Sequence, residues 1–183
     1  MKTIISPNPV SSVQEQIDKM PSDALIAFAY NEDTKSLHFG GRRIIEVCDA
    51  GGIISSNFRF DVQIENYNEE KPDLCILGLG YKGQIGFNEV ATPYDSLTHV
   101  QKLTESTKQQ FSFLGEVPDF GMTMGVKSIC ESKRIIVLAL GENKADAVFG
   151  MLYGRNDSTI PAAFLQIPVN VEVYLDEKAA CRL

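Results

Sequence analysis

Short apolar runs alternate with polar and amphipathic segments along the whole chain. An apolar run bounded by turn residues predicts a buried strand, and strict apolar–polar alternation predicts a half-buried one. On these criteria strands or extended segments are expected at residues 24–30, 58–64, 73–78, 97–104, 133–140 and 169–175. The run at 133–140, a cationic start followed by six apolar residues and a glycine, is the clearest core strand.

Helical spacing of apolar residues fills the intervals between these strands. The first helix is expected to start near Asn8, with Ser12 and Glu15 forming a capping box and apolar positions 13, 17 and 20 on one face. Further helical segments are predicted at residues 42–50, 105–113, 143–153 and 161–167. Strands separated by short helices predict an α/β fold with a doubly wound, mostly parallel sheet and helices on both faces, a Rossmann-like three-layer arrangement. The length fits one domain over residues 1–183.

Charge and composition exclude several functional classes. The net charge of −7 opposes nucleic-acid binding, which requires clustered cations. No apolar run is long enough to cross a membrane, and the first residues do not resemble a secretory signal. Four cysteines without CxxC spacing favour a reducing, cytoplasmic location, and two scattered histidines give no metal-ligand pattern. We therefore expect a cytoplasmic protein without a metal site.

The most informative segment, residues 73–89, is a buried strand that leads into a glycine-rich turn and ends in a carboxylate. Gly78, Gly80 and Gly83 permit a tight turn and close approach of the backbone to a ligand. Their spacing also matches the GxGxxG dinucleotide fingerprint. The residues after Gly83 have little helical pattern, and no acidic residue closes a second strand at the expected distance. We therefore expect no dinucleotide and no other cofactor.

Lys144 follows the strand at 133–140 closely and stands at the start of the next helix. An ammonium group beside helix N-terminal amides suits a phosphate. The alternative is an ordinary solvated lysine.

Two blocks of the chain, residues 73–89 and 120–176, resemble the glucosamine-6-phosphate deaminase and galactosamine-6-phosphate isomerase family. That family is related to the 6-phosphogluconolactonases, and its members are considerably longer than this chain. The resemblance implies a doubly wound α/β fold and aldose–ketose isomerisation of an amino-sugar phosphate with release of ammonia. It also implies a small-molecule sugar phosphate as the binding partner.

The resemblance assigns roles to individual residues. Glu65 aligns with an aspartate that moves a proton between carbons, and Glu89 with a glutamate that assists ring opening. Lys144 aligns with the lysine that grips the substrate phosphate. Gly78, Gly80, Lys82 and Gly83 would lie against the substrate, and Gln84 occupies a catalytic position.

The departures from the family pattern bear directly on catalysis. Lys82-Gly83-Gln84 replaces Asp-Gly-His, and a glutamine cannot transfer the proton that the histidine would, which typically costs about 10²–10⁴-fold in rate. The phosphate-binding loop after the first buried strand is replaced by Asn31-Glu32-Asp33-Thr34, whose carboxylates would repel a phosphate. In the family an arginine helps to hold the phosphate, and its position falls near Phe113 in this chain. His99 is the nearby histidine whose imidazole could substitute for the missing catalytic histidine.

Three interpretations stay open. The chain is a divergent family member with impaired catalysis that retains at most sugar-phosphate binding. Alternatively, it is an active isomerase or deaminase that uses Glu65 and Glu89. In the third interpretation it is a non-catalytic assembly or regulatory subunit, and homo-oligomerisation is open in all three.

Overall fold

The computed structural model describes residues 1–49 and 71–183, and all structural statements refer to these ranges. The strands are β1 (Lys2–Ile5), β2 (Leu25–Phe28), β3 (Arg43–Glu46), β4 (Cys48–Asp49), β5 (Leu74–Gly78), β6 (His99–Lys102), β7 (Phe120–Thr123), β8 (Ile135–Ala139) and β9 (Val171–Leu175). The α-helices are α1 (Pro9–Asp18), α3 (Glu105–Phe111), α4 (Val126–Cys130) and α5 (Ala145–Tyr153). The 3-10 helices are η1 (Ser112–Leu114), η2 (Glu142–Lys144) and η3 (Pro161–Gln166).

The central sheet has six strands in the order β1-β9-β8-β5-β2-β3. Every pair of neighbours is parallel, and the register places Ile76 opposite Ile136 and Val137 opposite Val173. A second, antiparallel sheet has the order β4-β7-β6. Parallel strands need crossover connections: α1 lies in the connection from β1 to β2, and α5 and η3 lie in the connection from β8 to β9, whereas turns connect β2 to β3.

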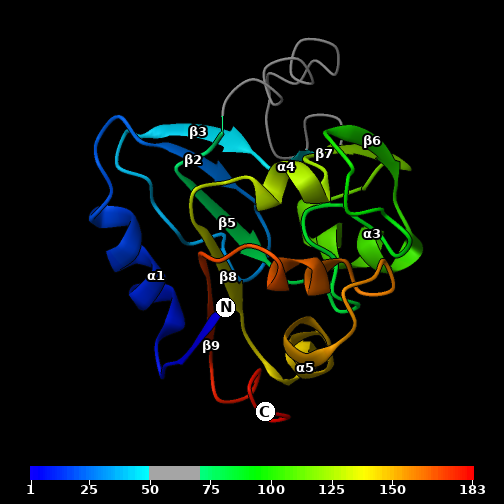
Figure 1. Ribbon diagram of the computed structural model, residues 1–183. Coiled ribbons are helices and arrows are strands. Elements are labelled where there is room, and N and C mark those ends of the chain that lie inside the picture. The colour runs from blue at the N-terminus through cyan, green and yellow to red at the C-terminus, as the bar shows by residue number, and fades with distance from the viewer. Residues whose placement is uncertain (50–70) are drawn as a thin grey trace.

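Alternate residues of the central strands enter two different cores. Ile76 of β5 and Ile136 of β8 pack with Val13 and Ile17 of α1 on one face. On the other face, alternating residues of the same strands pack with apolar residues of α4, α5 and η3. Figure 1 shows the sheet between α1 on one side and α4, α5 and the orange η3 segment on the other. The predicted three-layer, doubly wound fold is confirmed.

The predicted buried strands are present as β2, β5, β8 and β9, and the extended segment at 97–104 contains β6. The helical predictions at 105–113, 143–153 and 161–167 match α3 with η1, η2 with α5, and η3. The strand predicted at 58–64 lies outside the described residues. The pattern did not reveal β1, β7 or α4.

The helix predicted at 42–50 is wrong, because this segment forms β3 and then β4. β3 is an edge strand that pairs only with β2 in the described sheet, and Ile44 is 39% exposed. The apolar residues Ile44, Ile45 and Val47 do not alternate with polar residues, so their spacing resembled that of a helix. Pairing with β2 then decided the local structure, as tertiary context commonly does.

The predicted capping box is also wrong. Helix α1 begins with Pro9 at its first turn, and Asn8 is the cap: its Oδ1 accepts a hydrogen bond from Ser11 N at 3.3 Å. Ser12 lies inside the helix and its hydroxyl donates to Asn8 O at 3.2 Å. Proline is favoured at the first helical position, and asparagine directly before it is a strong cap.

In the described part of the chain, the helices are too short or too polar to traverse a bilayer. Cys48, Cys75, Cys130 and Cys181 are free thiols, and Cys75 is buried in β5 as the apolar pattern predicted.

Candidate functional site

The strand order places a natural binding position between β2 and β5. From β2 the chain moves outward to β3 and then returns to β5 on the other side of β2. Connections that leave in opposite directions open a crevice beyond the carboxyl ends of the two strands, where ligands of such folds usually bind. A cleft is found there. It is lined by Ala29, Tyr30, Asn31, Glu32, Cys48, Gly78, Gly80, Tyr81, Gln84, Gly86, Thr107, Gln110, Phe111 and Lys144.

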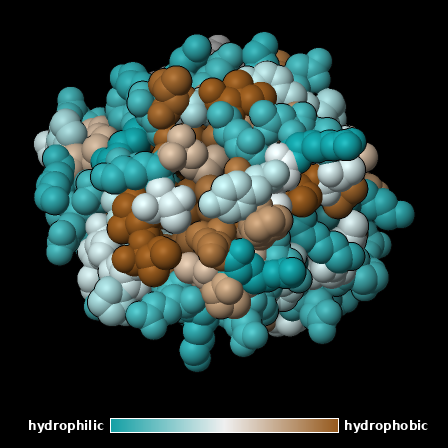
Figure 2. Space-filling model, turned by 60° about the horizontal axis from the view of Figure 1, so that its bottom comes forward, coloured by the Kyte–Doolittle hydropathy of each residue, from teal (hydrophilic) through white to brown (hydrophobic). Residues whose placement is uncertain are grey.

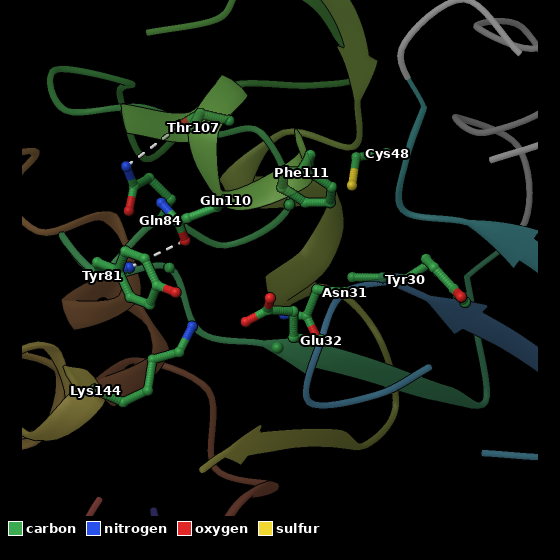
Figure 3. A pocket seen from close by; sticks show the side chains of 14 residues that line it. Tyr30, Asn31, Glu32, Cys48, Tyr81, Gln84, Thr107, Gln110, Phe111 and Lys144 are labelled. Atoms are coloured by element: carbon green, nitrogen blue, oxygen red, sulfur yellow. Dashed lines mark hydrogen bonds between the residues drawn. The ribbon is translucent and has the colours of Figure 1, made fainter. Parts of the chain in front are cut away.

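Lys144 supplies the positive charge of this cleft. It stands at the junction of η2 and α5, beyond the end of β8, and is only 4% exposed. Its Nζ donates a hydrogen bond to Leu79 O and lies 4.4 Å from the centre of the Tyr81 ring, a cation–π contact. Burial lowers the pKa of Lys144, and the nearby carboxylates of Asp33 and Glu32 oppose this effect. In Figure 3 the ammonium points into the cleft between Tyr81 and Glu32.

The loop after β2 carries the counter-charge. Asp33 Oδ2 lies 3.7 Å from Lys144 Nζ, and Asp33 is 5% exposed. Burial raises the pKa of Asp33 to about 6, although Lys144 acts in the opposite direction. The carboxylate therefore faces the ammonium, and an anion that approached Lys144 would meet this negative charge.

The backbone of this loop is hydrogen-bonded internally. Asn31 Oδ1 accepts from Asp33 N at 2.9 Å and from Thr34 N at 3.1 Å. Asn31 N in turn donates to Thr34 Oγ1 at 3.0 Å. These amides therefore point at protein oxygens rather than into the cleft.

The glycine-rich turn after β5 is closed by its own backbone. Gly80 N donates to Gln84 O and Gly83 N donates to Gly80 O, each at 2.9 Å. Gly83 has a φ of +75°, a conformation that side chains disfavour. A Cβ at Gly78 would lie 1.5 Å from Asn31 Nδ2, so only glycine lets the loop after β2 approach this turn.

Gln84 and Glu89 form a buried polar group at the inner end of the turn. Gln84 Oε1 accepts from Lys82 N at 3.0 Å, while its Nε2 lies 3.3 Å from Glu89 Oε2 and 3.4 Å from Thr107 Oγ1. Glu89 Oε1 accepts from Thr104 N at 3.1 Å, Thr104 Oγ1 at 3.0 Å and Thr107 Oγ1 at 2.5 Å. The N-terminus of α3 thus holds the carboxylate in place.

The cleft is narrow because its own side chains fill it. Its cavity volume of about 30 Å³ has room for water, and a hexose phosphate is far larger. A sugar phosphate therefore does not fit the enclosed part of the cleft in this conformation.

The structure gathers some of the predicted site residues and separates others. Gly78, Gly80, Gln84 and Lys144 line the cleft together. Lys82 is exposed and does not line the cleft. Gly83 and Glu89 are buried and do not line it either. Glu65 lies outside the described residues.

Two further candidates take other positions. Phe113 is 41% exposed, and its ring lies near those of Phe111 and Tyr30, both of which line the cleft. His99 lies on β6, where its ring nitrogens pair with Leu97 O at 2.8 Å and Gln101 Oε1 at 3.3 Å. It does not line the cleft, so it is not placed to replace the missing imidazole.

Several cleft residues were not predicted as part of a site. Tyr81 lies inside the glycine turn, and Thr107 and Gln110 are three residues apart on one face of α3. The helical spacing of Thr107 and Gln110 was the sequence signal that could have predicted a polar helix face at the cleft. Within residues 1–49 and 71–183 no group of three or more His, Cys, Asp or Glu side chains is placed to hold a metal ion.

Comparison with known proteins identifies relatives of this chain. No protein-family model matches it. A glucosamine-6-phosphate deaminase of Clostridium novyi is 43% identical over 138 residues, 73% of this chain and 56% of that protein. The corresponding deaminase of Streptococcus thermophilus is 47% identical over 115 residues, 61% of this chain and 49% of that protein. The chain spans about half the length of the curated relatives it matches.

Solved structures give the same result. A monomeric glucosamine-6-phosphate deaminase of the NagB superfamily superposes with a TM-score of 0.83 at 25% identity, covering all of both chains. A 6-phosphogluconolactonase from Trypanosoma brucei shares the fold, with a TM-score of 0.69 at 17% identity over 100% of this chain and 98% of that one. Together with the strand order and the glycine turn, these matches show that the chain belongs to the glucosamine-6-phosphate deaminase family.

Proposed function

We propose that this chain is a catalytically impaired member of the family, whose cleft binds an amino-sugar phosphate without converting it efficiently. The observation that carries the proposal is the hydrogen bonding of Gln84, which by the resemblance aligns with the family's catalytic histidine. Its amide accepts from the backbone of Lys82 and donates toward Glu89 and Thr107. An amide does not titrate near neutral pH, so it orients neighbouring groups without acting as a general acid or base.

The arrangement of Glu89 supports the same proposal. Its oxygens accept hydrogen bonds from Thr104, Thr107 and Gln84. Glu89 is 5% exposed and does not line the cleft, so it is not placed to take a proton directly from a molecule bound there. Its present contacts are those of a carboxylate that fixes the start of α3.

The binding half of the proposal depends on Lys144. This residue directs an ammonium into the cleft from the end of β8, and the amides of Gln84 and Gln110 and the ring of Tyr81 offer surfaces suited to a sugar. Polar groups that converge in a cleft at the switch point are the usual basis of ligand binding in this fold.

A combined turnover and binding assay tests this function. Glucosamine 6-phosphate is incubated with the protein while released ammonia is measured, and binding is followed by isothermal calorimetry. We expect no saturable ammonia release, together with binding that the Lys144→Met variant loses and the Lys82→Met variant keeps, because Lys82 is exposed and outside the lining. Efficient, saturable turnover would refute the impairment, and equal binding by the Lys144→Met variant would refute the site.

The same assay decides the active alternative. If turnover is found, Glu65→Gln and Glu89→Gln should each abolish it, because aldose–ketose conversion needs a positioned base. Turnover that survives both substitutions would remove Glu65 and Glu89 from the mechanism.

A non-catalytic assembly subunit is the second candidate, favoured by apolar residues at the surface. Figure 2 shows apolar side chains gathered on the face that lies at the bottom of Figure 1, where α5 is located. On α5, Phe149 is 46% and Tyr153 is 65% exposed. An unchanged melting temperature with sugar phosphates, combined with an oligomer that Tyr153→Ser dissociates, would favour this candidate.

A further inference from the structure

We propose that Asp33 determines whether the cleft accepts a phosphate group, because its buried carboxylate already serves as the counter-ion of Lys144. The inference rests on the proposed function and adds a specificity-determining residue to the same site. A phosphate must compete with a carboxylate that belongs to the protein itself.

The geometry of the pair carries the argument. The side chains of Lys144 and Asp33 are 5% and 6% exposed, and their charged atoms lie 3.7 Å apart. Asp33 Oδ2 has no hydrogen-bond partner within the described residues, so the adjacent ammonium is its main electrostatic support there. Two facing charges that are shielded from water interact strongly, and a second anion gains little from a cation that is already neutralised.

Three backbone amides of the surrounding loop are already engaged by protein oxygens. The amides of Asp33 and Thr34 are occupied by Asn31 Oδ1, and the amide of Asn31 by Thr34 Oγ1. Anion sites in comparable folds rely on backbone amides that point at the ligand. Here these three amides add nothing to the attraction that Lys144 supplies.

The remaining charged groups near the pair are negative. Glu32 lines the cleft beside Lys144, and Asp176, after β9, adds a weaker repulsion at Asp33. The Tyr81 ring also lies against the ammonium, with its centre 4.4 Å from Lys144 Nζ. Because burial raises the pKa of Asp33 to about 6, protonation of Asp33 below that pH removes one negative charge and leaves Lys144 free to pair with a phosphate.

Calorimetric binding of glucosamine 6-phosphate to the native protein and to the Asp33→Asn variant tests the inference. The variant keeps the size of the side chain and removes its charge. At pH 7.5 we expect it to bind at least about tenfold more tightly than the native protein, and at pH 5.5 the advantage should shrink to less than about threefold, as Asp33 becomes neutral in the native protein. Asp23→Asn, an equal charge change at an exposed position, should leave the affinity unchanged.

Two controls separate the possible failures. Unphosphorylated glucosamine should bind the native protein and the Asp33→Asn variant within about twofold of each other, because it makes no phosphate contact. Equal affinity of both proteins for glucosamine 6-phosphate at pH 7.5 would overturn the role of Asp33 and leave the proposed function intact. Absence of binding by both at either pH would overturn the proposed function itself. If Asp33→Asn does not fold, Asp33→Ser and the pH dependence of the native protein test the same point.

Discussion

Asp33 and Lys144 are two buried, charged side chains that lie close together after the end of β2, and each affects the pKa of the other. Asp33 has a folded-state pKa of about 6 against an ordinary 3.8, so the folded protein holds this proton more tightly than the unfolded chain. Its contribution to stability is complete below about pH 4 and is lost as the pH rises through about 6. The shift corresponds to about 3 kcal/mol.

Asp33→Asn should therefore remove part of the pH dependence of stability. Burial raises the pKa of Glu46 to about 7, so Glu46 also makes stability fall as the pH rises. It is present in both proteins, and its effect cancels in the comparison. Urea unfolding at pH 4.5, 5.5 and 7.5 and constant ionic strength would measure the free energy of unfolding. The native protein should lose about 2 kcal/mol more than the variant between the first and last pH, because at pH 4.5 part of the contribution is already gone. Parallel pH profiles would contradict the shifted pKa.

Thr107→Val should destabilise the protein because it removes a donor to the buried Glu89 carboxylate while preserving side-chain shape. Thr107 is 2% exposed and its hydroxyl lies 2.5 Å from Glu89 Oε1. The expected loss in free energy of unfolding is about 1–3 kcal/mol. Thr159→Val, which removes an exposed hydrogen bond to Asp157, should cost less than about 0.5 kcal/mol. Equal losses in free energy of unfolding for the two variants would show that the buried hydrogen bond to Glu89 contributes no more to stability than the exposed one to Asp157.

Among the elements, those with strong local patterns were predicted and those decided by distant pairing were not. The runs in β5 and β8 are apolar on both faces and bounded by turn residues, which identifies a parallel strand between two helical layers. β3 and β7 were mispredicted or missed because their structure depends on the strand alongside. For the same reason the cleft was predicted only in part. The glycine turn and Lys144 were visible in the sequence, whereas the approach of Asp33 to Lys144 follows from which loops meet at the switch point.

Helix α1 permits a direct test of how a helix start is encoded. Asn8→Ala should lower the free energy of unfolding by about 1 kcal/mol, since Asn8 Oδ1 caps Ser11 N. Ser12→Ala should cost clearly less, because Ser12 lies inside the helix and its hydroxyl only supplements the bond to Asn8 O. Thermal or urea unfolding of both variants would measure the difference. A larger loss in free energy of unfolding for Ser12→Ala than for Asn8→Ala would contradict the role of Asn8 as the cap and favour the capping box of Ser12 and Glu15.

At the scale of the whole molecule, both cores share one sheet, so the chain should unfold in a single cooperative step. Ile135 of β8 packs into the core on one face of the sheet and Leu138 into the core on the other, and both are fully buried. Ile135→Ala and Leu138→Ala should each reduce the free energy of unfolding by about 2–5 kcal/mol. Each should move the entire calorimetric transition to lower temperature. A second transition that only one variant shifts would indicate two independent units.

The order of strands also constrains how the sheet can assemble. In the central sheet β1 pairs only with β9, so Lys2 faces Glu172 and Ile5 faces Leu175. These partners are far apart along the chain, and a long loop must close before they can meet. Pairings of such high sequence separation form slowly, so we expect the β1 edge to be among the last parts of the sheet to assemble.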